Sequence, residues 1–325
     1  STNTVYEQGV TSILRQQEGM LKTQQQVSTG RRILTPADDP VAAARALDVT
    51  QAESLNTQYA GNRDYAKSSL GLAESILQGI TTLIQDVRTV TVEAGNPAFT
   101  DNDRAGLATG LRGRLDELIG LANSADGAGE YLFSGYQGRT KPFARTAAGV
   151  QYSGDQGQRL IQAAASRQIA VSDSGVDVFE RIKNGNGVFV TAAAAANSGS
   201  GVIGAGNVVT PASLTGHNYQ IIFTVAAGAT TYNVVDTTTA ATLSTANPYI
   251  SGNSISFDGL QFDIQGTPAG GDQFTVAPST NQSLFKTLSD LIAVVAAPVS
   301  GQSGSAKLSN GLNTALLNLD RGLDN

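Results

Sequence analysis

The feature that most constrains the fold is a helical apolar pattern running from Pro40 to Ala94. In its second half, apolar and small residues alternate in steps of four and three, which places them on one face of a helix. These positions are Ala66, Leu70, Ala73, Leu77, Ile80, Ile84, Val87, Thr91 and Ala94. A continuous helix of this extent measures on the order of 80 Å, at about 1.5 Å per residue. The pattern predicts an elongated bundle of long helices, and a compact bundle is the alternative.

A second helix is expected ahead of this one. Tyr6, Ile13, Met20 and Val27 stand seven residues apart and form one apolar row. The companion row is mostly polar, so this helix is not expected to sustain a coiled coil alone.

The link between the two helices carries stop and start signals. Gly30 can adopt the left-handed conformation that ends a helix, and Arg31 and Arg32 lie near its negative carbonyl end. A short extended link is expected next, because Pro36 biases the preceding residue away from helix. Asp39 before Pro40 is typical of an N-cap followed by proline at the first helical position.

The chain beyond Ala94 changes period twice. Thr100 and Asp103 predict a capped helix that continues to about Ala125. Glycine-rich turns and strand-like runs follow and predict a small antiparallel unit. The runs are 131–133, 143, 150–152, 160–161 and 169–171.

Composition shifts again near Gly185, since no lysine or arginine occurs between Lys183 and Lys286. Alternating apolar runs in this interval indicate strands, and helical periodicity returns after Asn281, with a break expected at 298–304. We therefore expect an α+β multidomain chain: an elongated long-helix bundle with a small β-hairpin unit, plus an inserted all-β domain. The helical domain covers 1–185 and 282–325, and the insert covers 186–281.

Several classes of function are disfavoured. A net charge of -6 gives no electrostatic reason to expect nucleic acid or an anionic membrane, and the absence of cysteine excludes disulfides and thiolate zinc sites. His217 is the only histidine, and no phosphate-binding GxxxxGK[ST] motif occurs. Asp38 and Asp39 fit a cap and turn better than an acid/base pair. No catalytic, cofactor or metal site is predicted.

Three stretches resemble a known family. Ser28–Ile33 followed by Thr35–Ala42 is similar to the amino-terminal signature of the flagellin superfamily, and Asp38-Asp39-Pro40-Val41 resembles its hook-associated protein 3 branch. Gly129–Gly135 with Thr140–Phe143, and Gly271–Val276 with 282–285, are similar to further motifs of that branch.

The resemblance implies a structural subunit that joins the flagellar hook to the filament and polymerises through its helical flanks. It implies these partners: further copies of itself, a neighbouring hook-associated protein, flagellin and a flagellar export chaperone. It also implies an extracellular location reached through the flagellar type III apparatus. The family has a terminal helix that pairs with the amino-terminal one, and such a segment looks missing here. The expected assembly residues are Arg31, Arg32, Asp38, Asp39 and Pro40, together with the row Tyr6, Ile13, Met20 and Val27.

Two alternatives stay open. The chain could be an extracellular glycan-binding or adhesin-like protein that uses the insert, although the alternating Tyr and Phe residues there are typical of a core. It could also be flagellin itself, against which the Pro40 and 131–143 motifs argue.

Overall fold

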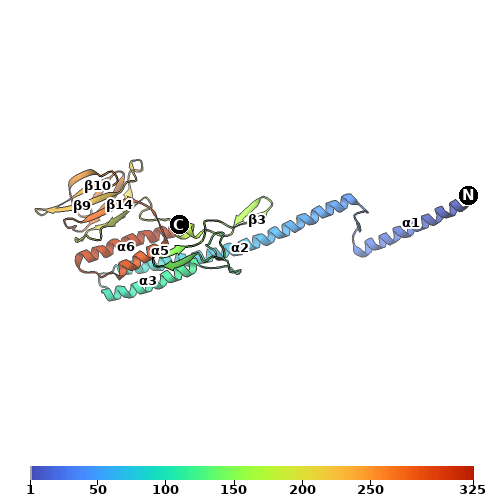
Figure 1. The fold of residues 1–325 in the computed structure, drawn as a ribbon, viewed down its shortest axis with the longest axis horizontal. Coiled ribbons are helices and arrows are strands. Elements are labelled where there is room, and N and C mark those ends of the chain that lie inside the picture. The colour runs from blue at the N-terminus through green and yellow to red at the C-terminus, as the bar shows by residue number, and fades with distance from the viewer. Residues whose placement is uncertain (1) are drawn as a thin grey trace. The chain divides into compact units, whose positions relative to one another are not determined.

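The computed structural model describes residues 2–325 (Figure 1). Helix α1 spans Thr2–Thr29, α2 spans Pro40–Ala94 and α3 spans Asp101–Ala122. The chain forms two compact units: one contains the chain up to Tyr65 with Gln162–Ile169, and the other contains Ala66–Ile161 with Ala170–Asn325. In the described part of the chain, no helix combines the length and apolar character needed to cross a membrane.

The first unit consists of α1, the turn after it and the beginning of α2, with the tip of one hairpin. That hairpin joins β3 (Leu160–Ala164) to β4 (Arg167–Ala170). The Asn62 side chain donates to the Gln162 carbonyl at 2.7 Å, and the Arg63 guanidinium donates to the Ala163 carbonyl at 2.9 Å. Two neighbouring side chains of α2 thus hold consecutive carbonyls of the hairpin.

The helices of the second unit share one hydrophobic core. It joins the end of α2 to α3, α4 (Gly175–Phe179), α5 (Leu284–Ala296) and α6 (Gly301–Asp324). Helix α5 contacts both α3 and α6. Thr100 and Asp103 form the expected capping box of α3, and Ser283 caps α5 by accepting from the Lys286 amide at 3.1 Å. The caps fix where each helix enters this core.

Short strand pairs lie beside the helices. They are β1 (Phe143–Thr146) with β2 (Gly149–Tyr152), and β5 (Ile182–Lys183) with β15 (Asn281–Gln282), both antiparallel. The expectation of a strand at 131–133 was wrong. Leu132 and Phe133 are buried in the helical core, but the chain turns there, and the Leu132 amide donates to the Ser124 carbonyl. Apolar character at these positions reflects burial and not strand pairing.

Other boundaries differ slightly from expectation. Helix α3 ends at Ala122 and not near Ala125, because the Asn123 side chain bonds both the amide and the carbonyl of Phe143, each at 2.9 Å. Helix α6 begins at Gly301, inside the break expected from the sequence. Leu70, placed in the seam of α2, is 40% exposed.

The insert is built from two sheets. The larger has the order β11-β10-β9-β14-β6, and the smaller has β12-β13-β7, with β8 also paired to β13. The strands are β6 (Phe189–Ala193), β7 (Val202–Ile203), β8 (Asn207–Val208), β9 (Tyr219–Ala226), β10 (Ala229–Asp236), β11 (Ala241–Pro248), β12 (Ser254–Phe257), β13 (Leu260–Gln265) and β14 (Gln273–Pro278). A 3-10 turn at Pro211–Ser213 connects β8 to β9. Side chains from both sheets form one core that is separate from the helical core.

Candidate assembly surface

Helix α1 presents an uncovered apolar stripe. Tyr6, Ile13, Met20 and Val27 are 72, 58, 73 and 79% exposed. Val10, Leu14 and Leu21 are also exposed and, at 100° per residue, fall on the same side of the helix. A contiguous apolar stripe in water is typical of an interaction surface. The single heptad row predicted from the sequence is narrower than the observed stripe, because Leu14 and Leu21 lie one position beyond that row.

The end of α1 is held by local contacts. Gly30 has φ 63°, in the left-handed region, directly after the last helical residue Thr29. The Gln26 side-chain amide donates to the Arg32 carbonyl at 2.6 Å, so the chain folds back along the last turns of the helix. Glycine therefore ends the helix as the sequence predicted.

Asp38 organises the turn that follows. One carboxylate oxygen accepts from the Leu34 and Thr35 amides at 3.1 and 2.9 Å, and the other lies 2.6 Å from the Lys22 amine on α1. The hydrogen bond from Lys22, supported by that from Thr35, lowers the pKa of Asp38 to about 2. The link was expected to be extended, but it is bent. Its Asp38 amide donates to the Thr35 carbonyl because the carboxylate closes a turn there.

Asp39 caps α2. Its Oδ1 atom accepts from the Ala42 amide at 3.0 Å, and this bond is the main cause that lowers the pKa of Asp39. The Arg32 guanidinium lies 3.3 Å from Oδ2. Pro40 is the first residue of the helix, as expected. Both carboxylates are thus occupied in holding the turn.

Arg31 differs from Arg32 in its surroundings. Both residues are exposed, but among residues 2–325 no ion pair of the Arg31 side chain is found. Arg31 is therefore the better placed of the two to contact a partner. Whether the nine candidate residues act in assembly stays a prediction.

Groups that could do chemistry are engaged in structural contacts. His217 Nδ1 lies 2.7 Å from the buried carboxylate of Asp236, which also accepts from the amides of Thr238 and Thr239. The neighbouring Tyr219 hydroxyl donates to Asp258 at 2.7 Å. Within the described chain, no group of three metal-ligating side chains comes together. These bonds connect the start of β9 to the loops after β10 and β12.

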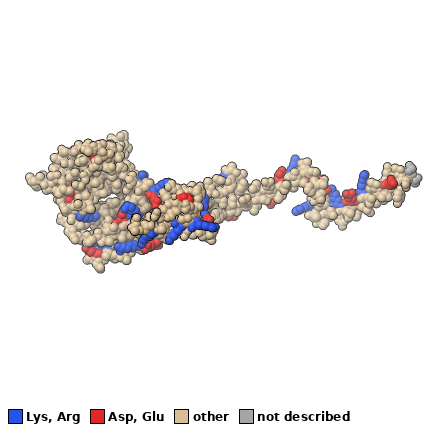
Figure 2. All heavy atoms as spheres, in the orientation of Figure 1, with Lys and Arg blue, Asp and Glu red and all other residues tan. Residues whose placement is uncertain are grey.

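The aromatic residues of the insert form its core. Tyr219, Phe223, Phe262 and Phe274 are buried, and no tyrosine or phenylalanine of the described insert is exposed. An exposed aromatic platform for sugar is therefore not present on it. In Figure 2 the surface formed by the insert is almost uniformly uncharged, in keeping with its lack of lysine and arginine.

Comparisons with known families match two parts of the chain. Residues 1–138 match the model of the bacterial flagellin N-terminal helical region. Residues 192–278 match the model of the flagellar hook-associated protein 1, D2-like domain. The amino-terminal helices are thus similar to those of the flagellin superfamily. The first match covers α1, the turn, α2 and α3, and the second covers most of the insert.

Individual relatives within the superfamily point to its hook-associated protein 3 branch. The chain is 40% identical over 182 residues to flagellar hook-associated protein 3 of Salmonella typhimurium. The matched region covers 56% of this chain and 57% of that protein. The matched part thus spans just over half the length of this curated relative.

Solved structures extend the likeness over most of the chain. A crystal structure of hook-associated protein 3 from Legionella pneumophila has 29% identity and a TM-score of 0.81, covering 85% of this chain and 86% of that one. A structure described as the flagellar junction protein FlgL from the same organism has 29% identity and a TM-score of 0.79, and the match covers 88% of this chain and 90% of that one. The expected α+β fold with an inserted β-domain is confirmed, and the relatives support the expectation that the chain is not an enzyme.

Proposed function

We propose that this chain is a member of the flagellin superfamily and a structural subunit that joins the flagellar hook to the filament. The observation that carries the proposal is the likeness to hook-associated protein 3 over most of the chain, including both the helices and the insert. The bonding of His217, Asp38 and Asp39 described above gives each a structural role.

The helical flanks are the proposed polymerisation surface. The apolar stripe of α1 is uncovered, and a subunit of an axial structure buries such a stripe against neighbouring helices. Arg31 and Arg32 lie on the turn next to it, while Asp38, Asp39 and Pro40 fix the shape of that turn. Further copies of the chain are the first proposed partners, with a hook-associated protein on the hook side and flagellin on the filament side.

Export is proposed to follow the flagellar type III route to the cell exterior. A chain without cysteine forms no disulfide before it is threaded unfolded. The exposed stripe of α1 needs cover before assembly, which supports a dedicated export chaperone as a further partner.

Domain boundaries are part of the proposal. The helical domain comprises 1–185 and 282–325, and the β-domain comprises 186–281. The separation of the two hydrophobic cores supports this division, because all buried members of the insert core lie between Phe189 and Val276. The helical core has no member between Ile182 and Leu284.

The test uses a strain that lacks the gene for this chain. Electron microscopy should show hooks without filaments, with flagellin shed into the medium, and the restored gene should return filaments. Hooks that still carry filaments in the deletion strain would contradict the junction role.

A further inference from the structure

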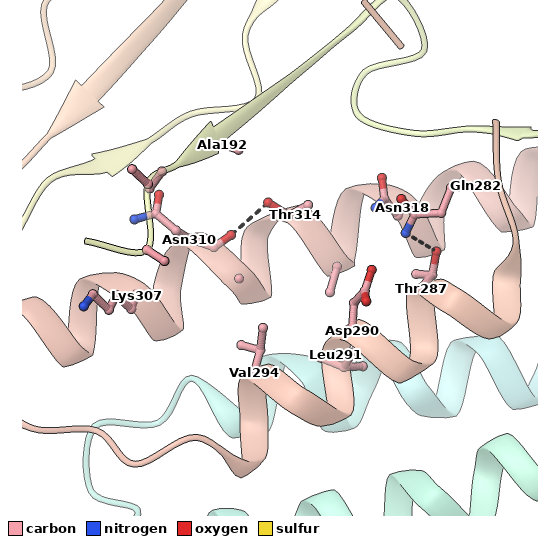
Figure 3. Close-up of a pocket in the computed structure, with 15 residues that line it drawn as sticks. Ala192, Gln282, Thr287, Asp290, Leu291, Val294, Lys307, Asn310, Thr314 and Asn318 are labelled. Atoms are coloured by element: carbon pink, nitrogen blue, oxygen red, sulfur yellow. Dashed lines mark hydrogen bonds between the residues drawn. The ribbon is translucent and has the colours of Figure 1, made fainter. Parts of the chain in front are cut away.

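Helix α6 has two faces with different partners. Leu312, Ala315 and Leu319 belong to the helical core. Asn310, Asn318 and Arg321 lie on another side and bond the insert and the segment that leads into it. Figure 3 shows Asn310, Thr314 and Asn318 in line along the helix, beside the β6 segment that contains Ala192. The same helix therefore packs in the helical core on one face and bonds the insert and its entry segment on another.

Asn310 completes the free edge of β7. On one side, β7 pairs with β13, with Ile203 opposite Ile264. On the other side, Asn310 Oδ1 accepts from the Ile203 amide at 2.9 Å and Nδ2 donates to the Gly201 carbonyl at 3.0 Å. A primary amide carries one acceptor and one donor group, so it substitutes for the backbone of a neighbouring strand. This edge is satisfied by a helix side chain and not by another strand.

Asn318 and Arg321 hold the segment that enters the insert. Asn318 is 5% exposed, and its Oδ1 atom accepts from the Gly185 amide at 2.9 Å. The Arg321 guanidinium donates to the Asn186 carbonyl. Gly185 has φ 60°, and a Cβ atom there would lie 2.3 Å from the Phe189 carbonyl oxygen. Glycine is thus required where the chain turns against the helix.

Apolar packing does not fill the seam between insert and helices. A cavity of about 360 Å³ lies there, between the segment Ala192–Ala195 and helices α5 and α6. Its helical wall includes Asp290, Val294 and Lys307. Domains joined by a small or incompletely packed interface are expected to move relative to one another. Polar bonds must therefore supply much of what holds the insert in place.

We propose that Asn310, Asn318 and Arg321 form a polar clamp that fixes the orientation of the insert on α6. The clamp acts at two separate segments, Gly185–Asn186 and Gly201–Ile203, so it opposes rotation as well as separation. The β5–β15 pair secures the two connecting strands to each other. Together these contacts make the insert and the helices one body. The proposal does not depend on the flagellar role.

The chain offers a direct test because it contains no cysteine. Thr109→Cys on α3 and Thr245→Cys on β11, both at exposed positions, provide two sites for spin labels on the full chain. Double electron-electron resonance then measures the distribution of distances between the label on the helices and the label on the insert. The otherwise unaltered chain should give one narrow distribution. Asn310→Leu combined with Asn318→Leu should widen it about twofold or more, because a freed domain samples several orientations.

Controls separate loss of the clamp from loss of the fold. Gln302→Leu changes an exposed primary amide near the start of the same helix and should leave the distribution narrow. Circular dichroism should show that each variant keeps its helix and strand content. Asn310→Ala with Asn318→Ala serves as a milder pair if leucine disrupts folding. A broad distribution in the parent chain, or an unchanged width in folded clamp variants, would overturn the proposal.

Discussion

Asparagine side chains repeatedly take the place of backbone at points where the chain leaves a regular element. Asn123 bonds the amide and carbonyl of Phe143, and Asn197 bonds both groups of Gln273 at 2.8 and 2.9 Å. Asn310 does the same for β7. At Phe143 and β7 the amide satisfies backbone groups that have no strand partner on that side, whereas the Gln273 carbonyl also accepts from the Ala194 amide. Asparagine, a residue type usually expected at the surface, therefore satisfies backbone groups where the chain leaves a helix or strand.

Asn123→Ala should show how much the bonds between Asn123 and Phe143 contribute to the stability of the fold. Phe143 is fully buried, so the substitution leaves its amide and carbonyl without their partner. We expect the free energy of unfolding to fall by roughly 2 kcal/mol, within the usual cost of unsatisfied buried polar groups. Denaturant unfolding measures this. Asn102→Ala, an exposed position on α3, is the matched control, and an equal loss in both variants would refute the account.

Asp38 predicts an acid-sensitive turn. Its pKa falls from 3.8 to about 2 in the folded chain. The contribution of the Asp38 carboxylate to the stability of the folded turn is therefore present above pH 3.8 and is lost as pH falls towards 2. The amide proton shifts of Leu34 and Thr35, measured by NMR, should titrate with a midpoint well below 3.8. Asp38→Asn should abolish this titration, whereas persistence of the same step would assign it to another group.

At the scale of elements, helix ends were more predictable than strands. Pro40, Ala94 and Thr100 mark boundaries where the structure has them, because caps and breaks act through a few adjacent residues. The turn at 131–133 was mistaken for a strand, and the short helix α4 was not foreseen. Both lie where burial in the helical core, and not local pattern, decides the conformation.

The candidate assembly surface was predictable only in part. The row from Tyr6 to Val27 follows from heptad spacing, but the bond between Lys22 and Asp38 joins residues in different elements. The Asn310 and Asn318 contacts likewise depend on the position of the insert against α6. Neither could be derived from periodicity, since spacing gives the face of a helix and not its partner.

Helix α1 should be separable into an assembly face and a neutral face. Met20→Asp puts a charge on the apolar stripe, where 73% exposure means that little folded packing is lost. We expect the free energy of unfolding to change by at most about 0.5 kcal/mol, as for most surface substitutions. Filament attachment in the complemented deletion strain should nevertheless fall sharply. Electron microscopy of the cells provides the measurement.

Gln8→Asp is the matched substitution on the face opposite the stripe. It adds the same charge to the same helix, so filaments should form normally. Equal defects in the two variants would show that charge on α1, and not its apolar stripe, governs attachment.

At the scale of the whole molecule, protease sites should distinguish the insert from the helices. Trypsin cleaves after lysine and arginine, which are absent between Lys183 and Lys286, so the insert should survive as one fragment. A protease of broad specificity should leave a similar core if the insert is a folded domain, because exposed linkers are cut before packed strands. Mass spectrometry of the fragments gives their ends. Rapid cleavage within β9 or β14 would contradict the proposed domain.

The pairing of β5 with β15 has a consequence for engineering and for the divergence of related chains. Lys183 and Asn281 stand opposite each other, so the chain leaves the helical core and re-enters it at adjacent points. Paired antiparallel residues have Cα atoms about 5 Å apart. Another folded module whose own termini are equally close could replace the insert without stretching the helices. This strand pair is therefore an attachment point at which one inserted domain could replace another while the helical core keeps its sequence.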